Sequence, residues 1–211
     1  MKVKICGVQD VKTALYAKQI GTDAIGFVFA KSKRQLSAEQ AKGIAAGLGK
    51  GPLKVGVFVN EELEKIESIA DQASLDVIQL HGDEPPEFAK SLRLPVIKAF
   101  SFEKGAKLSD MLSYPADFIL LDSPAGPYRG GNGTSFDWTL LEKESFDRSR
   151  LILAGGLNTE NVEEAIGTVR PFAVDVSSGV ETDGVKDREK IKQFIQTVKG
   201  VTKDDYICTT R

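Results

Sequence analysis

The 211-residue sequence has few of the residues that build metal sites and disulfide scaffolds. It contains one histidine and two cysteines, Cys6 and Cys208, which lie near opposite ends of the chain. Two cysteines so placed form no disulfide framework, and one histidine without clustered cysteines argues against a zinc site. We therefore expect no metal. Sparse, unpaired cysteines are typical of a reducing compartment, so we expect a cytoplasmic protein.

The sequence also lacks an excess of charge of one sign and any long hydrophobic run. With 28 basic and 30 acidic residues, the formal net charge is -2. Nucleic-acid binders usually carry a basic stripe, so we expect no nucleic-acid partner. No uncharged apolar stretch approaches the roughly 18 residues of a membrane span, and the N-terminus has no signal-peptide core. We therefore expect no membrane partner.

What the sequence does contain is a regular alternation of short apolar runs and helical patterns. Eight runs have the length and composition of buried parallel strands. They cover residues 3–6, 24–29, 54–59, 77–80, 95–100, 118–122, 151–155 and 173–177. Eight βα units predict an α/β fold, a single-domain (β/α)8 TIM barrel with eight parallel strands. The alternative, an open doubly wound sheet, usually has fewer strands.

No linker or shift in composition divides the chain, so we expect one barrel domain over residues 1–200 and a C-terminal tail over 201–211. Helix signals support this division. Asp10 and Gly21 bound one predicted helix, Ser37 and Gln40 have the spacing of a capping box, and a third helix is expected to begin at Asn60. Further helices are predicted over 158–169 and 187–200, with weaker or shorter patterns over 103–116 and 137–144.

Polar residues stand at the carboxyl ends of several predicted strands, where barrel enzymes build their active sites. They include Cys6, His81, Asp122 and Asp175. Each has an ordinary structural explanation when taken singly: a lone cysteine is often a small buried residue, and an aspartate often caps a helix. Their gathering at one mouth of the barrel is harder to explain by chance, and it predicts a catalytic or binding site there.

Glycine-rich stretches follow the seventh and eighth predicted strands. They are "LAGGLNTENV", with Gly155 and Gly156, and "DVSSGVE", with Gly179. In barrels these two loops often hold a phosphate on backbone N–H groups, and glycine lets the backbone approach the anion. Ordinary turn chemistry is the alternative. Their position favours a phosphorylated ligand.

A third glycine-rich stretch, "GGNGTSF", does not fit a dinucleotide-binding motif. Gly131 and Gly133 match its first two glycines, but Phe136 occupies the place of the third. The stretch also lies well after a strand instead of at a strand–helix turn. We interpret it as a loop that follows the sixth strand.

Eight ordered blocks carry a resemblance to a known family. They are "KICG", "GFVFAKSKR", "VGVFVN", "QLHGDE", "LLDS", "GGNGTSFDW", "AGGLNTENV" and "RPFAVDVSSGVE", which together span residues 3 to about 187. In these blocks the chain resembles phosphoribosylanthranilate isomerase. The resemblance implies a single-domain (β/α)8 barrel that catalyses the Amadori rearrangement of N-(5′-phosphoribosyl)anthranilate in tryptophan biosynthesis.

The resemblance also implies a role for individual residues. It makes Cys6 the general base and Asp122 the general acid, with no cofactor. It implies a small-molecule phosphosugar substrate whose contacts are Arg34, His81 and Asp175. The substrate's phosphate would lie on the two glycine-rich loops, at Gly155, Gly156, Ser177, Ser178 and Gly179.

The residues themselves leave some alternatives open. Lys4, on the same strand face as Cys6, is expected either to lower the pKa of the thiol or to pair with a carboxylate at the barrel mouth. Another phosphosugar barrel enzyme, a flavin-dependent barrel and a non-catalytic phosphometabolite-binding barrel are the rival functions. No exposed apolar stripe is evident, so we expect a monomer, with a homodimer as the alternative.

Overall fold

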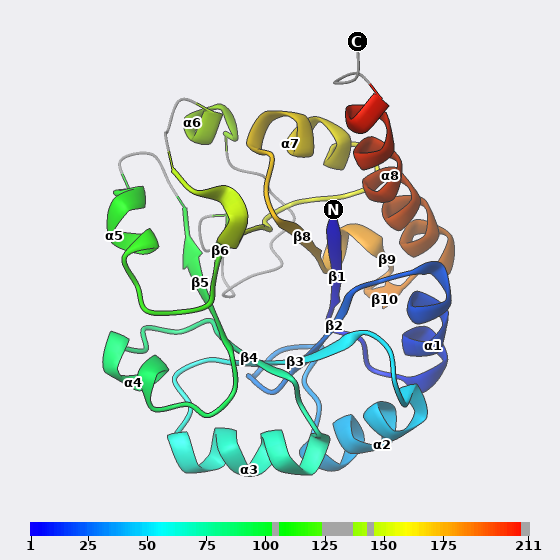
Figure 1. The fold of residues 1–211 in the computed structure, drawn as a ribbon. Helices are drawn as coiled ribbons and strands as arrows, with labels where there is room; N and C mark the ends of the chain where they lie inside the picture. The colour runs from blue at the N-terminus through cyan, green and yellow to red at the C-terminus, as the bar shows by residue number, and fades with distance from the viewer. Residues whose placement is uncertain (103–105, 124–136, 143–145, 208–211) are drawn as a thin grey trace.

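The structure, a computed structural model, describes residues 1–102, 106–123, 137–142 and 146–207. Eight parallel strands form a closed barrel in sequence order (Figure 1). The strands are β1 (Lys2–Cys6), β2 (Ala24–Val28), β3 (Leu53–Phe58), β4 (Val77–Leu80), β5 (Val96–Ser101), β6 (Phe118–Asp122), β7 (Leu151–Leu153) and β8 (Ala173–Val176). The barrel closes where Lys2 of β1 pairs with Ala173 of β8. The predicted barrel is thereby confirmed, and the open sheet is excluded.

Helices surround the strands, as Figure 1 shows. They are α1 (Val11–Ile20), α2 (Ala38–Leu48), α3 (Leu63–Ala73), α4 (Pro86–Lys90), α5 (Leu108–Leu112), α6 (Thr139–Glu142), α7 (Val162–Val169) and α8 (Arg188–Ile207). Two 3-10 turns, η1 (Arg148–Arg150) and η2 (Ser178–Val180), and a hairpin of β9 (Glu181–Thr182) and β10 (Val185–Lys186) complete the chain. Within the described residues, no helix is long and apolar enough to cross a membrane.

Most of the predicted helix boundaries are confirmed. The side chain of Asp10 caps α1, Gly21 ends it at a φ of 104°, and the capping box of Ser37 and Gln40 is present at α2. The predicted start of α3 is wrong, because the helix begins at Leu63. Asn60 instead has a φ of 49°, and its side chain accepts a hydrogen bond from the backbone N–H of Asp83.

The last helix is longer than expected. The sequence predicts an end near residue 200, whereas α8 continues to Ile207, into the stretch expected to be a tail. It contacts α1 and α7 and so completes the ring of helices between the two ends of the chain. Residues 208–211, with Cys208, lie outside the described part.

Alternation along the strands separates two apolar cores. Side chains that point outward, such as Val3 and Ile5, belong to a large cluster between strands and helices. Side chains that point inward fill the barrel, among them Val55, Ile97 and Leu120. Lys4 and Cys6 alternate with Val3 and Ile5, so β1 delivers a lysine and a thiol to the barrel interior, where both are buried.

Candidate active site

The predicted site residues lie at the carboxyl ends of the barrel strands. Cys6 ends β1 and Asp122 ends β6, while His81 directly follows β4 and Asp175 lies within β8. Because all strands of the closed barrel are parallel, their carboxyl ends meet at one mouth. Cys6, Asp122 and Asp175 are each more than nine-tenths buried there.

Cys6 is a free thiol in a close-fitting position. On the neighbouring strand, Gly26 lies so near that a Cβ there would come within 2.7 Å of the Cys6 Sγ. Burial raises the pKa of the Cys6 thiol above its ordinary value, and the positive charges of Lys4 and Lys186 offset this only in part. Lys4 thus lowers the pKa of the thiol, as expected, but the cost of burying a thiolate is larger, so the pKa of Cys6 stays above its ordinary value and is not brought toward neutrality.

Lys4 also fulfils the second role that the sequence left open. Its Nζ forms an ion pair with Asp175 Oδ1 at 2.9 Å, and both side chains are almost completely buried. Burial alone would lower the pKa of Lys4, but Asp175 and Cys6 outweigh it and hold the pKa above its ordinary value. A protonated lysine thus lies between a carboxylate and the thiol, and it favours the thiolate whenever the proton leaves Cys6.

Arg34 is held by a carboxylate that sequence reasoning did not single out. Its Nε and Nη2 donate to the two oxygens of Glu181 at 2.6 and 2.8 Å. Lys186 Nζ lies 2.6 Å from the same carboxylate, and Lys33 Nζ lies 3.5 Å from it. Three cations around one carboxylate leave this side of the mouth positively charged. An anionic substrate group is favoured here.

The Glu181 carboxylate depends on these cations. Burial alone would raise the pKa of Glu181, but hydrogen bonds from Arg34 and Lys186 outweigh it and lower the pKa to about 2. Lys186 also donates to the backbone oxygen of Ser177 at 2.9 Å, and Ser177 Oγ donates to the backbone oxygen of Cys6 at 3.1 Å. The hairpin of β9 and β10 is in this way fastened to the ends of β8 and β1.

Asp122 forms the second polar group of the mouth, together with His81. The His81 Nε2 lies 3.5 Å from Asp122 Oδ2, and the backbone N–H of Ser123 donates to Asp122 Oδ1 at 2.8 Å. When Asp122 is ionised, each of its carboxylate oxygens therefore has a neighbouring group, the Ser123 N–H at Oδ1 and the His81 ring at Oδ2. That arrangement suits a group that gives up a proton during a reaction.

A buried ion pair supports the loop that carries His81. Lys98 Nζ lies 2.8 Å from Glu84 Oε2 and donates to the backbone oxygen of Gly82 at 2.6 Å. Burial alone would raise the pKa of Glu84, but the hydrogen bonds from Lys98 and from the Asn60 backbone outweigh it, and the pKa lies below its ordinary value. These contacts fix the backbone just after His81.

The two glycine-rich loops lie against each other. Gly179 packs so closely on the backbone oxygen of Leu157 that any side chain there would overlap it. Gly155 and Gly156 both have positive φ, at 82° and 64°, and Asn161 donates to the backbone oxygen of Gly156 at 3.0 Å. The loops after β7 and β8, which also contain Ser177 and Ser178, thus form one surface at the mouth.

The structure therefore brings together most of the predicted residues in local groups. Cys6 lies with Asp175 and Ser177, and His81 lies with Asp122. Sequence reasoning missed Glu181, Lys186 and Gly26 as neighbours of the site. Glu181 was visible in the block "SSGVE", but no sequence signal assigned it to Arg34. The stretch "GGNGTSF" lies outside the described residues.

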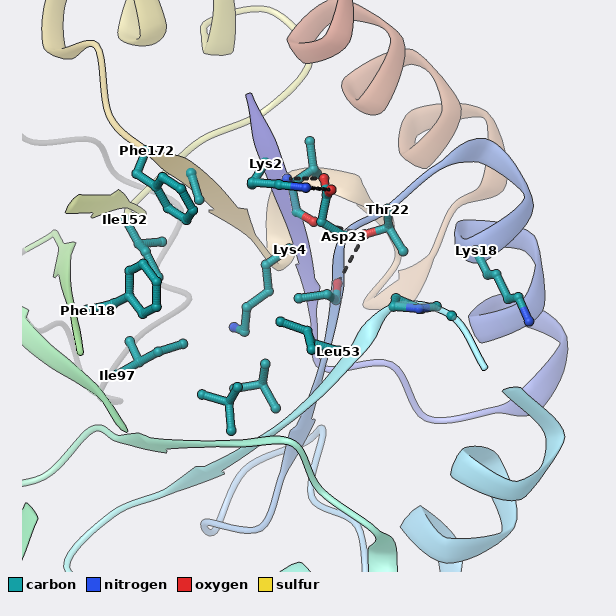
Figure 2. A pocket seen from close by; sticks show the side chains of 17 residues that line it. Lys2, Lys4, Lys18, Thr22, Asp23, Leu53, Ile97, Phe118, Ile152 and Phe172 are labelled. Carbon is teal, nitrogen blue, oxygen red and sulfur yellow. Dashed lines mark hydrogen bonds and ion pairs between the residues drawn. The ribbon is translucent and has the colours of Figure 1, made fainter. Parts of the chain in front are cut away.

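A cavity of about 600 Å³ lies at the opposite, amino-terminal end of the barrel (Figure 2). Apolar side chains line most of it, including Leu53, Ile97, Phe118, Ile152 and Phe172. Lys4 extends into it from β1, while Lys2 pairs with Asp23 at its rim. It lacks the thiol, the histidine and the Asp122 carboxylate, so it is distinct from the candidate active site.

Comparison with known proteins agrees with this geometry. Residues 3–197 match a family model described as N-(5'phosphoribosyl)anthranilate (PRA) isomerase. The chain is 52% identical over 204 residues, 96% of its length, to the whole of N-(5'-phosphoribosyl)anthranilate isomerase from Bacillus cereus (strain G9842).

Solved structures give the same result. The chain is similar to phosphoribosyl anthranilate isomerase from Thermotoga maritima, with a TM-score of 0.86 and 46% identity over 95% of this chain and 99% of that one. It is also similar to a phosphoribosyl anthranilate isomerase in complex with reduced 1-(o-carboxyphenylamino)-1-deoxyribulose 5-phosphate, with a TM-score of 0.83, 45% identity and the same coverage. A further similar structure, with a TM-score of 0.80, 45% identity and the same coverage, is of monomers generated from the dimeric Thermotoga maritima protein.

Proposed function

The chain belongs to the N-(5'-phosphoribosyl)anthranilate isomerase family, and from that premise we propose which of its residues carry out the isomerisation. The protein is an isomerase of tryptophan biosynthesis whose substrate is a small phosphosugar. The reaction is an Amadori rearrangement of N-(5′-phosphoribosyl)anthranilate to 1-(2-carboxyphenylamino)-1-deoxyribulose 5-phosphate. It needs one group that donates a proton and one that accepts a proton.

Asp122 is the general acid. Opening of the furanose ring requires a proton on the ring oxygen, and Asp122 supplies it as the C1′–O bond breaks. The product of this step is a protonated Schiff base and an Asp122 carboxylate. The N–H of Ser123, which lies 2.8 Å from Oδ1, and the His81 ring beside Oδ2 stabilise that carboxylate as it forms.

Cys6 is the general base. The Schiff base makes the hydrogen on C2′ acidic, and the Cys6 thiolate removes it to give an enolamine, which tautomerises to the ketone. Burial keeps Cys6 as a thiol in the free protein, so the thiolate forms only against that cost, with Lys4 and Lys186 favouring it. The cycle closes when the proton gained by Cys6 is returned through solvent to Asp122.

The charged groups of the mouth bind the rest of the substrate. Arg34 and the cations around Glu181 favour an anionic substrate group on one side. The loops that contain Gly155, Gly156 and residues 177–179 receive the phosphate on backbone N–H groups. Asp175 and His81, whose side chains lie beside Cys6 and Asp122, contact the sugar.

The observation that carries this assignment is that a buried thiol and a buried aspartate end two strands of one closed barrel, β1 and β6. A barrel that only binds a phosphometabolite has no use for both. The experiment that tests it follows the fluorescence of N-(5′-phosphoribosyl)anthranilate, generated in situ, with the wild type and the variants Cys6→Ser and Asp122→Asn.

Rapid loss of fluorescence with the wild type and a rate lower by about 10²- to 10⁴-fold with each variant is the expected result. The variant Cys208→Ser, which changes the other cysteine, serves as the control and keeps full activity. Undiminished activity of Cys6→Ser or Asp122→Asn would overturn the assigned role of that residue. A wild type without activity would overturn the isomerase function.

The oligomeric state is a separate part of the proposal. The sequence favoured a monomer because no apolar stripe was evident, yet Leu53 is 51% exposed and Phe172 is 40% exposed beside the amino-terminal cavity. Phe172 stacks on Phe118 with ring centroids 5.2 Å apart. We therefore propose the alternative, a homodimer in which a second copy covers this apolar end of the barrel.

Light scattering tests the dimer. The wild type is expected to have the mass of two chains and Leu53→Lys the mass of one. Val185→Lys, which charges an exposed apolar residue on the hairpin of β9 and β10, is the matched control and stays dimeric. A monomeric wild type, or a dimeric Leu53→Lys, would contradict this interface. Action in the cytoplasm remains a prediction, supported by the sparse cysteines.

A further inference from the structure

Gln79 is a buried amide that the proposed chemistry does not yet use. It lies on β4 with only 1% of its surface exposed. Residues 79 and 81 project from the same side of the chain because side chains alternate along a strand. The Gln79 Nε2 lies 3.2 Å from His81 Nδ1. Its Oε1 is buried and has no hydrogen-bond partner within the described part of the chain.

This contact couples the orientation of the Gln79 amide to the position of the proton on the His81 ring. A neutral imidazole has one N–H and one lone pair, and an amide nitrogen can only donate. If Gln79 Nε2 donates to Nδ1, the lone pair is on Nδ1 and the proton is on Nε2. The Nε2 atom is the one that faces Asp122 Oδ2, at 3.5 Å.

The reverse arrangement is less favourable for an ionised Asp122. Were the amide turned so that its oxygen accepted from Nδ1–H, the lone pair of Nε2 would face the carboxylate oxygen, and two acceptors would repel each other. The amide would still leave one of its polar atoms without a partner. Because either orientation leaves one polar atom of the amide unpartnered among the described residues, the Asp122 carboxylate decides between them, and it favours the orientation with Nε2 of Gln79 toward the ring.

We propose that Gln79 is a positioning residue, which holds His81 in the tautomer with its proton on Nε2 so that His81 donates to the Asp122 carboxylate. The proposal rests on the assignment of Asp122 as the general acid. When Asp122 gives its proton to the ring oxygen, negative charge develops on its carboxyl oxygens. A donor already aimed at Oδ2 stabilises that charge in the transition state, and the hydrogen bond shortens as the charge forms.

The chain offers an unusually direct test, because His81 is its only histidine. In a two-dimensional spectrum that correlates imidazole ¹⁵N with the ring hydrogens, both nitrogen signals belong to His81 without further assignment. At a pH where the ring is neutral, the wild type is expected to have its proton on Nε2. A proton on Nδ1 in the wild type would overturn the proposal, whatever any variant does.

Two variants extend the test. Gln79→Met keeps a similar volume and removes the donor, so the ring is expected to become a mixture of tautomers. Gln79→Glu offers only acceptor oxygens when ionised, so it is expected to move the proton to Nδ1. Since one hydrogen bond is worth about 1 kcal/mol, kcat should fall roughly five- to tenfold in Gln79→Met while KM changes little.

The control is Gln72→Met, at an exposed glutamine of α3 whose amide donates a hydrogen bond to Ser68 on the same helix. It should leave both the ¹⁵N spectrum and kcat unchanged. An unaltered tautomer in Gln79→Met, or a loss of activity confined to KM, would contradict the positioning role. The spectrum does not depend on turnover, so an inactive wild type would overturn the isomerase function and leave the tautomer result standing.

Discussion

Lys4 Nζ and Asp175 Oδ1 lie 2.9 Å apart inside the barrel, on neighbouring strands, with 4% and 9% of their side chains exposed. A buried pair of this kind contributes little to stability compared with an apolar pair of the same shape, because both charges lose their hydration. It persists here beside Cys6, where Lys4 favours a thiolate. The ion pair is thus better explained by its effect on the candidate active site than by a contribution to the stability of the barrel core.

Removal of one partner of this pair should be costly. Asp175→Asn leaves Lys4 buried without its carboxylate, and Lys4→Met leaves Asp175 without its cation. Each single variant is expected to lower the free energy of unfolding by about 3–5 kcal/mol. The double variant should lose much less than the sum of the two, since neither buried charge remains. Urea unfolding of the four proteins measures this coupling.

A surface pair provides the control for that cycle. Glu61 lies just before α3 and pairs with Lys65 in its first turn, and 28% of the Glu61 side chain and 60% of the Lys65 side chain are exposed. Lys65→Met should change the free energy of unfolding by less than about 0.5 kcal/mol. Additive losses in the double variant Lys4→Met/Asp175→Asn would show that the two side chains do not depend on each other.

The sequence predicted the barrel because local patterns determine it. All eight strands were found, since buried parallel strands are nearly continuous apolar runs between helices with recognisable caps. The start of α3 was missed because Asn60, a typical capping residue, is used instead to hold the backbone of Asp83. In that place a contact between two loops outweighed the local capping preference.

The site was predictable only in part, for a related reason. Cys6 and Asp122 could be predicted from their positions at the carboxyl ends of strands, because the topology of a parallel barrel brings such residues to one mouth. The partner of Arg34 is Glu181, 147 residues later, and no periodicity connects the two. The raised pKa of the Cys6 thiol likewise follows from how closely the barrel packs around it, which composition does not reveal.

The ionisation of Cys6 can be measured directly. In a Cys208→Ser background, the ultraviolet absorbance of the thiolate should appear with a midpoint above the ordinary thiol pKa of 9.0, because burial raises the pKa of Cys6. Lys186→Met removes a positive charge that favours the thiolate and should move the midpoint to still higher pH. A midpoint below 9.0 in the parent protein would contradict the burial argument.

The matched control for that titration is Lys33→Met. Lys33 contacts the same Glu181 carboxylate, at 3.5 Å, but it is not among the groups that perturb Cys6. Its removal should leave the thiolate midpoint in place. Equal shifts in the two variants would mean that Lys186 acts through Glu181 and not through its own charge near the thiol.

Gly26 is expected to be a determinant of Cys6 geometry. Gly26→Ala places a methyl group 2.7 Å from Cys6 Sγ and 3.1 Å from its Cα, so the thiol must move. The expected result is a destabilisation of about 1–3 kcal/mol and a fall in kcat of at least roughly tenfold. Steady-state kinetics and urea unfolding measure the two effects. In a Cys6→Ala background, the contact with Sγ is absent while the contact with Cα remains, so part of the destabilisation should disappear.

Gly43 provides the control that distinguishes displacement of the thiol from a general effect of replacing glycine with alanine. Gly43 lies within α2 with open space around its Cα, so Gly43→Ala should stabilise the protein by about 0.5–1 kcal/mol and leave kcat unchanged. A Gly26→Ala protein with wild-type kcat would show that the thiol tolerates displacement, and it would weaken the case for Cys6 as the base.

Glu181 should make the protein sensitive to acid. Its pKa is about 2 in the folded protein, against an ordinary value of 4.5. A carboxyl whose pKa is lowered by folding stabilises the protein fully above 4.5, and this contribution is lost as the pH falls through 2. The difference between these two pKa values corresponds to on the order of 3 kcal/mol of stability. Glu181→Gln is expected to be less stable than the wild type at neutral pH, because it leaves Arg34 and Lys186 without their carboxylate.

The difference in free energy of unfolding between the wild type and Glu181→Gln should then narrow as the pH is lowered from 4.5 toward 2. Over this range the wild type loses the stabilisation that comes from its Glu181 carboxylate, which the variant lacks at every pH. Urea midpoints over that range measure the gap, and subtraction of the two curves removes the contribution of the other carboxyl groups. Glu61→Gln, at the exposed pair with Lys65, is the control and should track the wild type within about 0.5 kcal/mol. A difference in free energy of unfolding that stays constant with pH would contradict the stabilisation of the Glu181 carboxylate by Arg34, Lys186 and Lys33.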